Sequence, residues 1–341
     1  MSRFAGFLLV VSGLMSGAET MRPAPRLSSY YKLVLTYDTN VFRYSDSDLD
    51  SFRISINPDR FPVRSADDLD AALSAGLKYR FKQGRRFGHL GARFKSHLYV
   101  SNQDKSYGLG AVEASVPAWS GARCRAEFIW MPGYLIRYYR PAGQDDYRAC
   151  RFTEFLVRAE ATQELWRLSL TPYYAFEVDD YLSLFDYYDT RAHRPGVRVG
   201  FEVVRGLDLA AEYGLKLASA RGPVPDISYL QYGFRVWVSS RPKNLDRLSF
   251  GASYGHEMRT FTTENSGELD PSHAGREDLI EDVELEVGYR LGNVKLVLAY
   301  QLAWREAFSP YSERIEDIKQ YGQNRVSLGA VVTPGLGERS R

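Results

Sequence analysis

Charged side chains recur at every second residue in several segments, and this spacing defines the first chemistry that the sequence offers. Lys78, Arg80 and Lys82 alternate with aromatic residues, and Arg93 and Lys95 repeat the spacing. Side chains two residues apart point to the same face of a β-strand. Rows of fixed charge attract or repel ions and polar solutes, as the charged side chains that line selective pores do.

A hydrolytic site is the competing chemistry. His256 and Glu257 lie near Ser253 in the sequence, so the residue types of a catalytic triad are present. However, no serine stands in a G-x-S-x-G motif, and serine, histidine and an acid occur somewhere in almost any chain of this length. We therefore expect no catalytic residues, and a barrel hydrolase is the weakest of the alternatives.

Acidic residues gather between positions 43 and 69, at Asp46, Asp48, Asp50, Asp67 and Asp68. Their spacing fits no calcium-binding loop, so we expect neither a metal site nor a cofactor. This connection is the best candidate to fold into a lumen as a constriction, and a solvated external loop is the alternative that we favour.

The elements that would position the charged rows are β-strands. Residues 73–82 alternate between an apolar and a polar face, and the pattern restarts after a break at 83–86, as in a β-hairpin. About fourteen such segments of roughly 12 to 18 residues follow one another, which is long for the strands of a soluble protein. They begin near Tyr30, Asp70, Phe87, Ser106, Gly121, Arg148, Glu164, Arg194, Leu207, Ser228, Leu245, Glu277, Asn293 and Gln320.

The connections between these segments alternate between short and long. Short ones lie at 83–86, 118–120, 162–163, 205–206, 241–244 and 291–292, and longer polar ones separate them. Short periplasmic turns and longer external loops are typical of a transmembrane β-barrel. The sequence thus predicts an all-β fold, a single antiparallel barrel of about fourteen strands. Because Pro132 and Gly133 interrupt the fifth segment, twelve or sixteen strands are also compatible.

The strand order predicts that the two cysteines stay free thiols. Cys124 falls near the periplasmic end of its strand and Cys150 near the external end of the next. A disulfide needs Cα atoms within about 7 Å, and this register separates them by much more.

Composition and the first segment agree with this fold. The 341 residues include 44 Lys and Arg against 42 Asp and Glu, a mean hydropathy of −0.35, and 24 Tyr, 18 Phe and 5 Trp. The balanced charge argues against a nucleic-acid partner. We expect a signal peptide at 1–18, a short periplasmic leader at 19–28, the barrel at 29–334 and a periplasmic tail at 335–341. Aromatic residues should form two membrane-interface girdles, with membrane lipid around the barrel. Beside the short turns these are Trp119 and Trp166, and near the long connections they are Tyr134, Tyr138, Tyr139, Tyr181, Phe185, Tyr187 and Tyr188.

The apolar face of each strand must point to lipid, because a charge there costs about 2–4 kcal/mol at mid-bilayer. The charged face therefore lines the lumen. The expected pore-lining residues are Lys78, Arg80, Lys82, Arg93, Lys95, Arg123, Arg125, Arg158, Arg198, Asp282, Glu284 and Glu286. A basic and an acidic wall would set up a transverse field, or the same groups would pair as a structural lattice of salt bridges.

The chain resembles porin-type β-barrels of the bacterial outer membrane over residues 29–334. A local likeness is Tyr37-Asp38-Thr39-Asn40-Val41, which is similar to the Tyr-Asp-x-Asn-Val/Ile opening strand of porin-like barrels, some of them linked to polysaccharide export. The chain departs from that pattern at its end, where Thr333-Pro334-Gly335 replaces a terminal aromatic residue. The resemblance implies an outer-membrane channel for small polar, including anionic, solutes. A barrel component of an envelope or polysaccharide export assembly, with its export partners, is the alternative, and the oligomeric state stays open.

Overall fold

The structure is a computed structural model that describes residues 26–84, 86–119, 121–141, 143–312 and 314–333. The predicted signal peptide, residues 19–25 of the predicted leader, and the predicted tail lie outside these residues. The first strand begins at Arg26, three residues before the expected start of the barrel, and the last ends at Val332.

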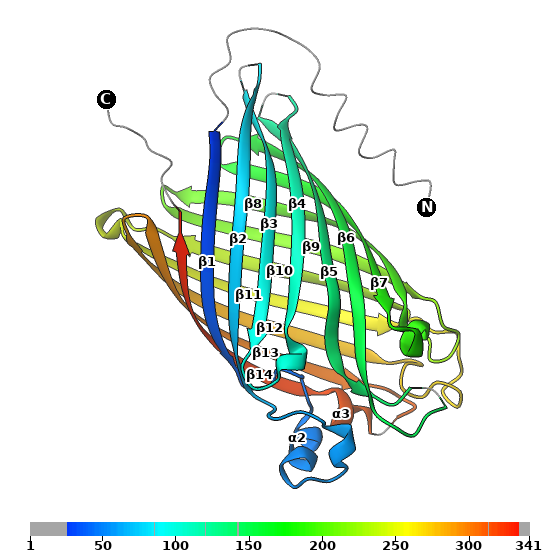
Figure 1. Ribbon diagram of the computed structural model, residues 1–341. Coiled ribbons are helices and arrows are strands. Elements are labelled where there is room, and N and C mark those ends of the chain that lie inside the picture. The colour runs from blue at the N-terminus through cyan, green and yellow to red at the C-terminus, as the bar shows by residue number, and fades with distance from the viewer. Residues whose placement is uncertain (1–25, 85, 120, 142, 313, 334–341) are drawn as a thin grey trace.

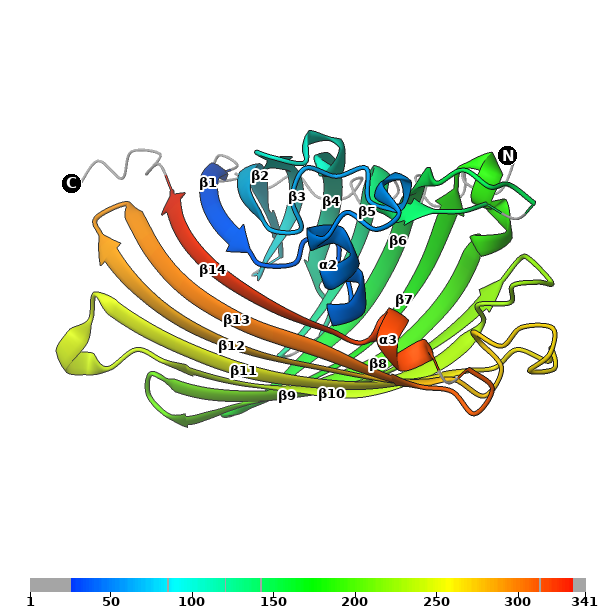
Figure 2. The ribbon, with the colours of Figure 1, turned by 90° about the horizontal axis from the view of Figure 1, so that it is seen from below.

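Within the described residues, fourteen antiparallel strands form one closed barrel, as the sequence predicts (Figures 1 and 2). The strands are β1 Arg26–Asp38, β2 Asp68–Gln83, β3 Arg86–Tyr99, β4 Tyr107–Pro117, β5 Ala122–Tyr139, β6 Arg148–Leu165, β7 Leu168–Tyr181, β8 Thr190–Val204, β9 Leu207–Ala220, β10 Tyr229–Ser240, β11 Leu248–Phe261, β12 Glu277–Leu291, β13 Val294–Phe308 and β14 Tyr321–Val332. The helices are short: α2 Asp46–Arg53, α3 Ile315–Lys319, and the 3₁₀ turns η1 Pro58–Arg60, η2 Gln103–Lys105, η3 Ser183–Tyr188 and η4 Lys243–Leu245. No described helix is long and apolar enough to cross a membrane.

Each strand pairs with its sequence neighbours, and β1 closes the barrel by pairing with β14 from Tyr31 opposite Val332 to Asp38 opposite Arg325. A closed ladder leaves no sheet edge, so the strand backbones bond to one another and need no water. The start of β1 and the end of β14 lie at one end of the barrel, and α2 and α3 lie at the other (Figure 1). We call these the periplasmic and the external end.

The outer face of the barrel carries a band of exposed apolar side chains. Leu77, Phe94, Leu298 and Leu328 are each more than half exposed and point away from the lumen. Most of their strand neighbours on the inner face are polar, charged or small, such as Lys78, Arg93 and Ser327. This alternation matches the predicted lipid-facing and water-facing sides.

Two irregular places in the sequence are resolved by the structure. Pro132 and Gly133 lie inside β5, where register shifts fall between Met131 and Tyr134 and again between Leu135 and Arg137. Gly133 adopts a φ of +64°, which costs a residue without Cβ nothing. The strand therefore bends and continues, and the strand count stays at fourteen.

The predicted turn at 162–163 is wrong. β6 continues to Leu165, which pairs with Leu168, and the turn is Trp166-Arg167 with Trp166 at a φ of +56°. The alternation Glu160, Thr162, Glu164 continues without a break through the predicted turn, so the polar residues there mark the lumen face of a strand.

Residues 39–67, which we call the inner loop, pack against the wall at the external end. Val41, Phe42, Tyr44 and Phe61 are almost fully buried in one cluster with Leu135 of β5. The expectation of a solvated external loop is therefore wrong for this cluster, whereas residues 53–59 of the same loop are exposed. The aromatic side chains exclude water between the inner loop and β5, which favours the constriction over a loop in solvent.

Candidate functional site

The structure places all twelve predicted pore-lining residues on the inner face of the barrel. The register between strands shows this. Arg80 of β2 lies opposite His89 of β3, His89 lies opposite Ser115 of β4, and Ser115 lies opposite Arg125 of β5. Residues paired across strands share a face. The fixed charges of the chain therefore converge on one lumen.

Four of the predicted cations lie within 4 Å of a carboxylate on the same strand or on a nearby strand. Arg93 lies 2.8 Å from Glu127, Arg125 lies 2.6 Å from Glu113, Arg158 lies 3.2 Å from Glu160, and Arg198 lies 2.7 Å from Glu212. These pairs form along the wall and do not reach across the lumen. For these four residues the geometry is that of a salt-bridge lattice.

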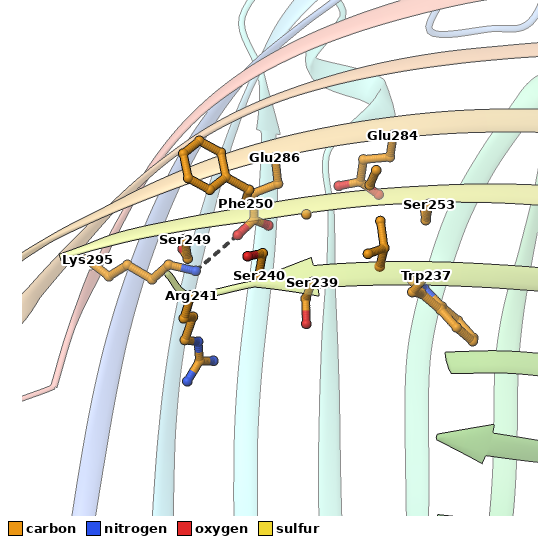
Figure 3. Close-up of a pocket in the computed structure, with 13 residues that line it drawn as sticks. Trp237, Ser239, Ser240, Arg241, Ser249, Phe250, Ser253, Glu284, Glu286 and Lys295 are labelled. Atoms are coloured by element: carbon orange, nitrogen blue, oxygen red, sulfur yellow. Dashed lines mark hydrogen bonds and ion pairs between the residues drawn. The ribbon is translucent and has the colours of Figure 1, made fainter. Parts of the chain in front are cut away.

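Two of the three predicted acids are also paired locally. Asp282 accepts a hydrogen bond of 2.7 Å from Arg235, and Glu286 accepts one of 3.0 Å from Lys295. Figure 3 shows the second pair beside Glu284, for which no cation lies within 4 Å among the described residues. Glu284, Glu286 and Lys295 border a hollow of about 230 Å³ that Trp237 and Ser253 also line.

The remaining predicted cations have no carboxylate within 4 Å in the described part of the chain. They are Lys78, Arg80, Lys82, Lys95 and Arg123. Lys32 of β1, which the sequence reasoning missed, joins them: it lies opposite Ser74, and Ser74 lies opposite Lys95. In the sequence, the alternation of Lys32 with the apolar side chains of Tyr31 and Leu33 indicates that Lys32 lies on the charged face of its strand. We call these six residues the unpaired cationic wall.

A second hollow, of about 390 Å³, opens beside this wall. Lys78, Arg93, Glu113 and Glu127 line it together with Tyr30 of β1. It brings an unpaired cation next to two ion-paired carboxylates, which is a polar surface suited to hydrated solutes and not to an apolar ligand.

On the wall formed by β7, β8 and β9, glycine residues leave room for the side chain of Tyr173 to lie flat against the strands. A Cβ on Gly196 would meet the ring of Tyr173 at 2.3 Å, so glycine is needed there. The Tyr173 hydroxyl donates to Glu212 at 2.9 Å, and the guanidinium of Arg158 stacks on its ring at 4.1 Å. The packing holds these side chains against the wall and leaves the lumen wider than extended side chains would.

The inner loop is fixed to the wall by two cations. Lys105 of η2 donates to the carbonyls of Leu135 and Ile136 at 2.5 and 3.1 Å, and lies over the ring of Phe42 at 5.3 Å. Arg137 donates to the Phe42 carbonyl at 2.6 Å and lies over Tyr44. Burial lowers the pKa of Lys105 well below its usual value. The bulges of β5 expose the carbonyls that make this attachment possible.

The Tyr-Asp-x-Asn motif closes the barrel. Asp38 accepts from Gln323 at 2.8 and 2.9 Å and from Arg325 at 2.8 Å. Asn40, almost fully buried, exchanges hydrogen bonds with Tyr44 and donates to the carbonyl of Gly322. These residues join β1, β14 and the inner loop, so their role in the structure is to hold the seam.

The residues of the candidate hydrolytic site do not come together in the structure. His256 points outward from β11 and Ser253 points into the lumen, so the two cannot act together. His97 lies 2.6 Å from Asp70 on the inner wall. Cys124 and Cys150 are free thiols near opposite ends of the β5–β6 hairpin, as predicted.

One group of three acids lies close enough to hold a metal ion among the described residues: Glu154, Glu177 and Asp179, with ligand atoms within 4.8 Å of one another. The sequence reasoning did not find it, because the three come from two strands. Arg194 and Lys216 bind Glu177 at 2.8 and 2.5 Å. These cations neutralise part of the charge that a metal ion would need.

The expected external girdle is partly wrong. Trp119 and Trp166 are exposed beside periplasmic turns, as predicted. At the external end, however, Tyr134 contacts Phe152, and Phe152 contacts Tyr181, with ring centroids 5.5 and 5.2 Å apart. These rings face the lumen, because the register sets Phe152 opposite Tyr134 and Tyr181 on the inner face.

No family model and no curated protein matches the chain. The solved outer membrane channel DcaP of Acinetobacter baumannii is similar to it, with a TM-score of 0.51 and 13% identity over 91% of this chain and 97% of that one. Two further similar structures are OmpT of Vibrio cholerae in its trimer form (TM-score 0.49, 10% identity, 92% and 100% covered) and an anion-selective porin from Comamonas acidovorans (0.44, 7%, 91% and 99%). The first likeness shows the fold of an outer-membrane channel. The apolar outer band and the closed barrel agree with a place in the bacterial outer membrane.

Proposed function

We propose that this outer-membrane β-barrel is a passive channel for small polar solutes and that it favours anions. Solutes diffuse through a lumen lined by fixed charge, without a cofactor and without turnover. Membrane lipid surrounds the apolar band, and the ends of the lumen open to the periplasm and to the outside.

The unpaired cationic wall carries the proposal. Salt bridges pair other cations of the inner face with carboxylates, but these six cations have no carboxylate within 4 Å among the described residues. An uncancelled positive wall raises the local concentration of anions and lowers that of cations. The preference therefore comes from this side of the lumen.

The inner loop sets the upper size of the solute. Fourteen strands lie between barrels of eight, which fill with side chains, and barrels of sixteen to eighteen, which leave an open channel. The buried cluster of Phe42, Tyr44 and Phe61 narrows the external end of this lumen further. Small hydrated molecules are the class that such a lumen admits.

Planar-bilayer recording of the purified, refolded full chain tests the proposal. We expect discrete conductance steps and, in a salt gradient, a reversal potential of the sign that anion preference gives. A native barrel, verified by its heat-dependent gel mobility, that shows no conductance would contradict the proposal and favour the export-assembly alternative.

A further inference from the structure

A cluster of cations lies at the external end, away from the unpaired cationic wall. It consists of Arg137 of β5, Arg259 of β11, Arg276 of the β11–β12 loop, Arg305 of β13 and Lys319 of α3. We call it the external cation cluster. Its members come from five elements far apart in the sequence, so no local pattern reveals it.

One fully buried carboxylate serves two of these guanidinium groups. Asp278 accepts from Arg276 at 2.9 and 3.0 Å and also accepts from Arg305. Arg276 is 2% exposed and Asp278 is not exposed at all. A single carboxylate between the buried Arg276 and the partly buried Arg305 leaves one positive charge uncompensated.

Two donors of the cluster have no acceptor in the described part of the chain. The Nε–H of Arg305 is buried without a hydrogen-bond partner. The ammonium of Lys319 has no carboxylate within 4 Å and only lies over the ring of Tyr139, at 5.7 Å. A buried donor such as the Nε–H of Arg305 is destabilising when it has no acceptor, and more so when it is charged.

The other members add charge and little compensation. Arg259 donates to the neutral amide oxygen of Gln231 at 2.9 and 3.1 Å. Arg137 lies 3.8 Å from Asp48, but Asp48 also binds Arg60 at 2.5 Å. Five cations thus share two carboxylates, one of which is already engaged elsewhere.

We propose that the external cation cluster binds a small oxyanion, a carboxylate or a phosphate group, between Arg305 and Lys319. Oxyanions accept charge-assisted hydrogen bonds from guanidinium and ammonium groups, and one bound here would supply the missing acceptor for both donors. This rests on the proposed function, because it assigns the first binding site of an anion that enters from outside.

The surroundings of Lys319 support this site. Burial, followed by the charges of Arg276, Arg137 and Arg305, lowers the pKa of Lys319 well below its usual value. A bound anion opposes these charges, so it raises that pKa and binding takes up a proton. The site also adjoins the inner loop, because α3 packs against both β13 and α2.

Titration calorimetry of the detergent-solubilised full chain, with inorganic phosphate or acetate as the probe, tests the site. We expect saturable binding of at least one probe, with proton uptake when two buffers of different ionisation enthalpy are compared. Lys319→Gln should weaken binding at least tenfold and abolish the uptake. Arg305→Lys, which keeps the charge near Asp278 but removes the Nε–H, should also weaken it.

Arg290→Gln, at the periplasmic end of β12, is the matched control and should leave binding unchanged. Binding of phosphate alone identifies a phosphate site, and binding of acetate alone identifies a carboxylate site. Absence of both, or equal binding by wild type and both cluster variants, overturns the inference. The outcome is separate from that of the proposed function, since a barrel that conducts but binds neither probe refutes only this site.

Discussion

Neutralising the centre of the unpaired cationic wall should reverse or abolish the ion preference of the channel. The variant is Lys32→Gln, Lys78→Gln and Lys95→Gln combined, on three adjacent strands. None of these ammonium groups has a carboxylate within 4 Å in the described residues, so their removal leaves no acid unpaired. The fold should therefore tolerate the change.

The size of the effect follows from Coulomb's law. A unit charge about 8 Å from the ion path contributes about 0.5 kcal/mol in water, and a Debye length of about 10 Å at 0.1 M salt reduces this to about 0.2 kcal/mol. Three charges then supply about 0.7 kcal/mol. Because anions lose and cations gain this amount, the anion-to-cation permeability ratio should fall about tenfold.

Reversal potentials in a potassium chloride gradient measure this ratio directly. The matched control is Arg198→Gln combined with Glu212→Gln, which removes one paired cation with its carboxylate and keeps the net charge. It should shift the ratio less than twofold. An unchanged ratio in the triple variant would refute the argument that unpaired wall cations set selectivity, as would an equal shift in the control. At 1 M salt the difference between wild type and the triple variant should shrink, because the Debye length falls to about 3 Å.

Three further predictions concern the seam and the external mouth. Asn40→Ala removes buried hydrogen bonds to Tyr44 and β14 and should lower the free energy of unfolding by about 2–4 kcal/mol. Urea titration in detergent measures this change. An unchanged midpoint would show that the seam does not depend on Asn40. Lys105→Met removes the ammonium that binds carbonyls of β5 and lies over Phe42 of the inner loop, so it should raise single-channel conductance. A conductance equal to wild type would show that this contact does not narrow the lumen. Burial lowers the pKa of His273, which faces Asp270, Arg276 and Lys319, so a conformation that exposes His273 to water binds more protons and acidification from pH 7 to pH 5 should favour that conformation and raise conductance. Conductance at the two pH values checks this, and His273→Gln should remove the difference.

The alternation of residues predicted most of the fold. Strand length, period and the order of short and long connections each depend on local sequence, so fourteen strands, their faces and both free cysteines followed from it. The boundaries that failed did so where local pattern is ambiguous. The sequence predicted that a strand begins near Glu164, whereas in the structure Leu165 pairs with Leu168 across a two-residue turn.

The direction of the inner loop could not be predicted in the same way. Its acids indicated a solvated loop, but its aromatic residues pack against Leu135 and other wall residues, and two register shifts in β5 flank Leu135. Likewise, the position of the tyrosines near external loops predicted a membrane-interface girdle, whereas Tyr134 and Tyr181 contact other aromatic rings inside the lumen.

The sequence by itself determined that the charged residues share one face, because a strand repeats every two residues whatever its neighbours are. Only the tertiary structure decided which charges cancel. Whether Arg198 meets Glu212 while Lys78 meets no carboxylate depends on the register between strands, and the external cation cluster depends on five elements meeting at one mouth. Local sequence thus decides which residues line the lumen, but the closed barrel decides which of their charges stay unpaired and so the electric field in the lumen.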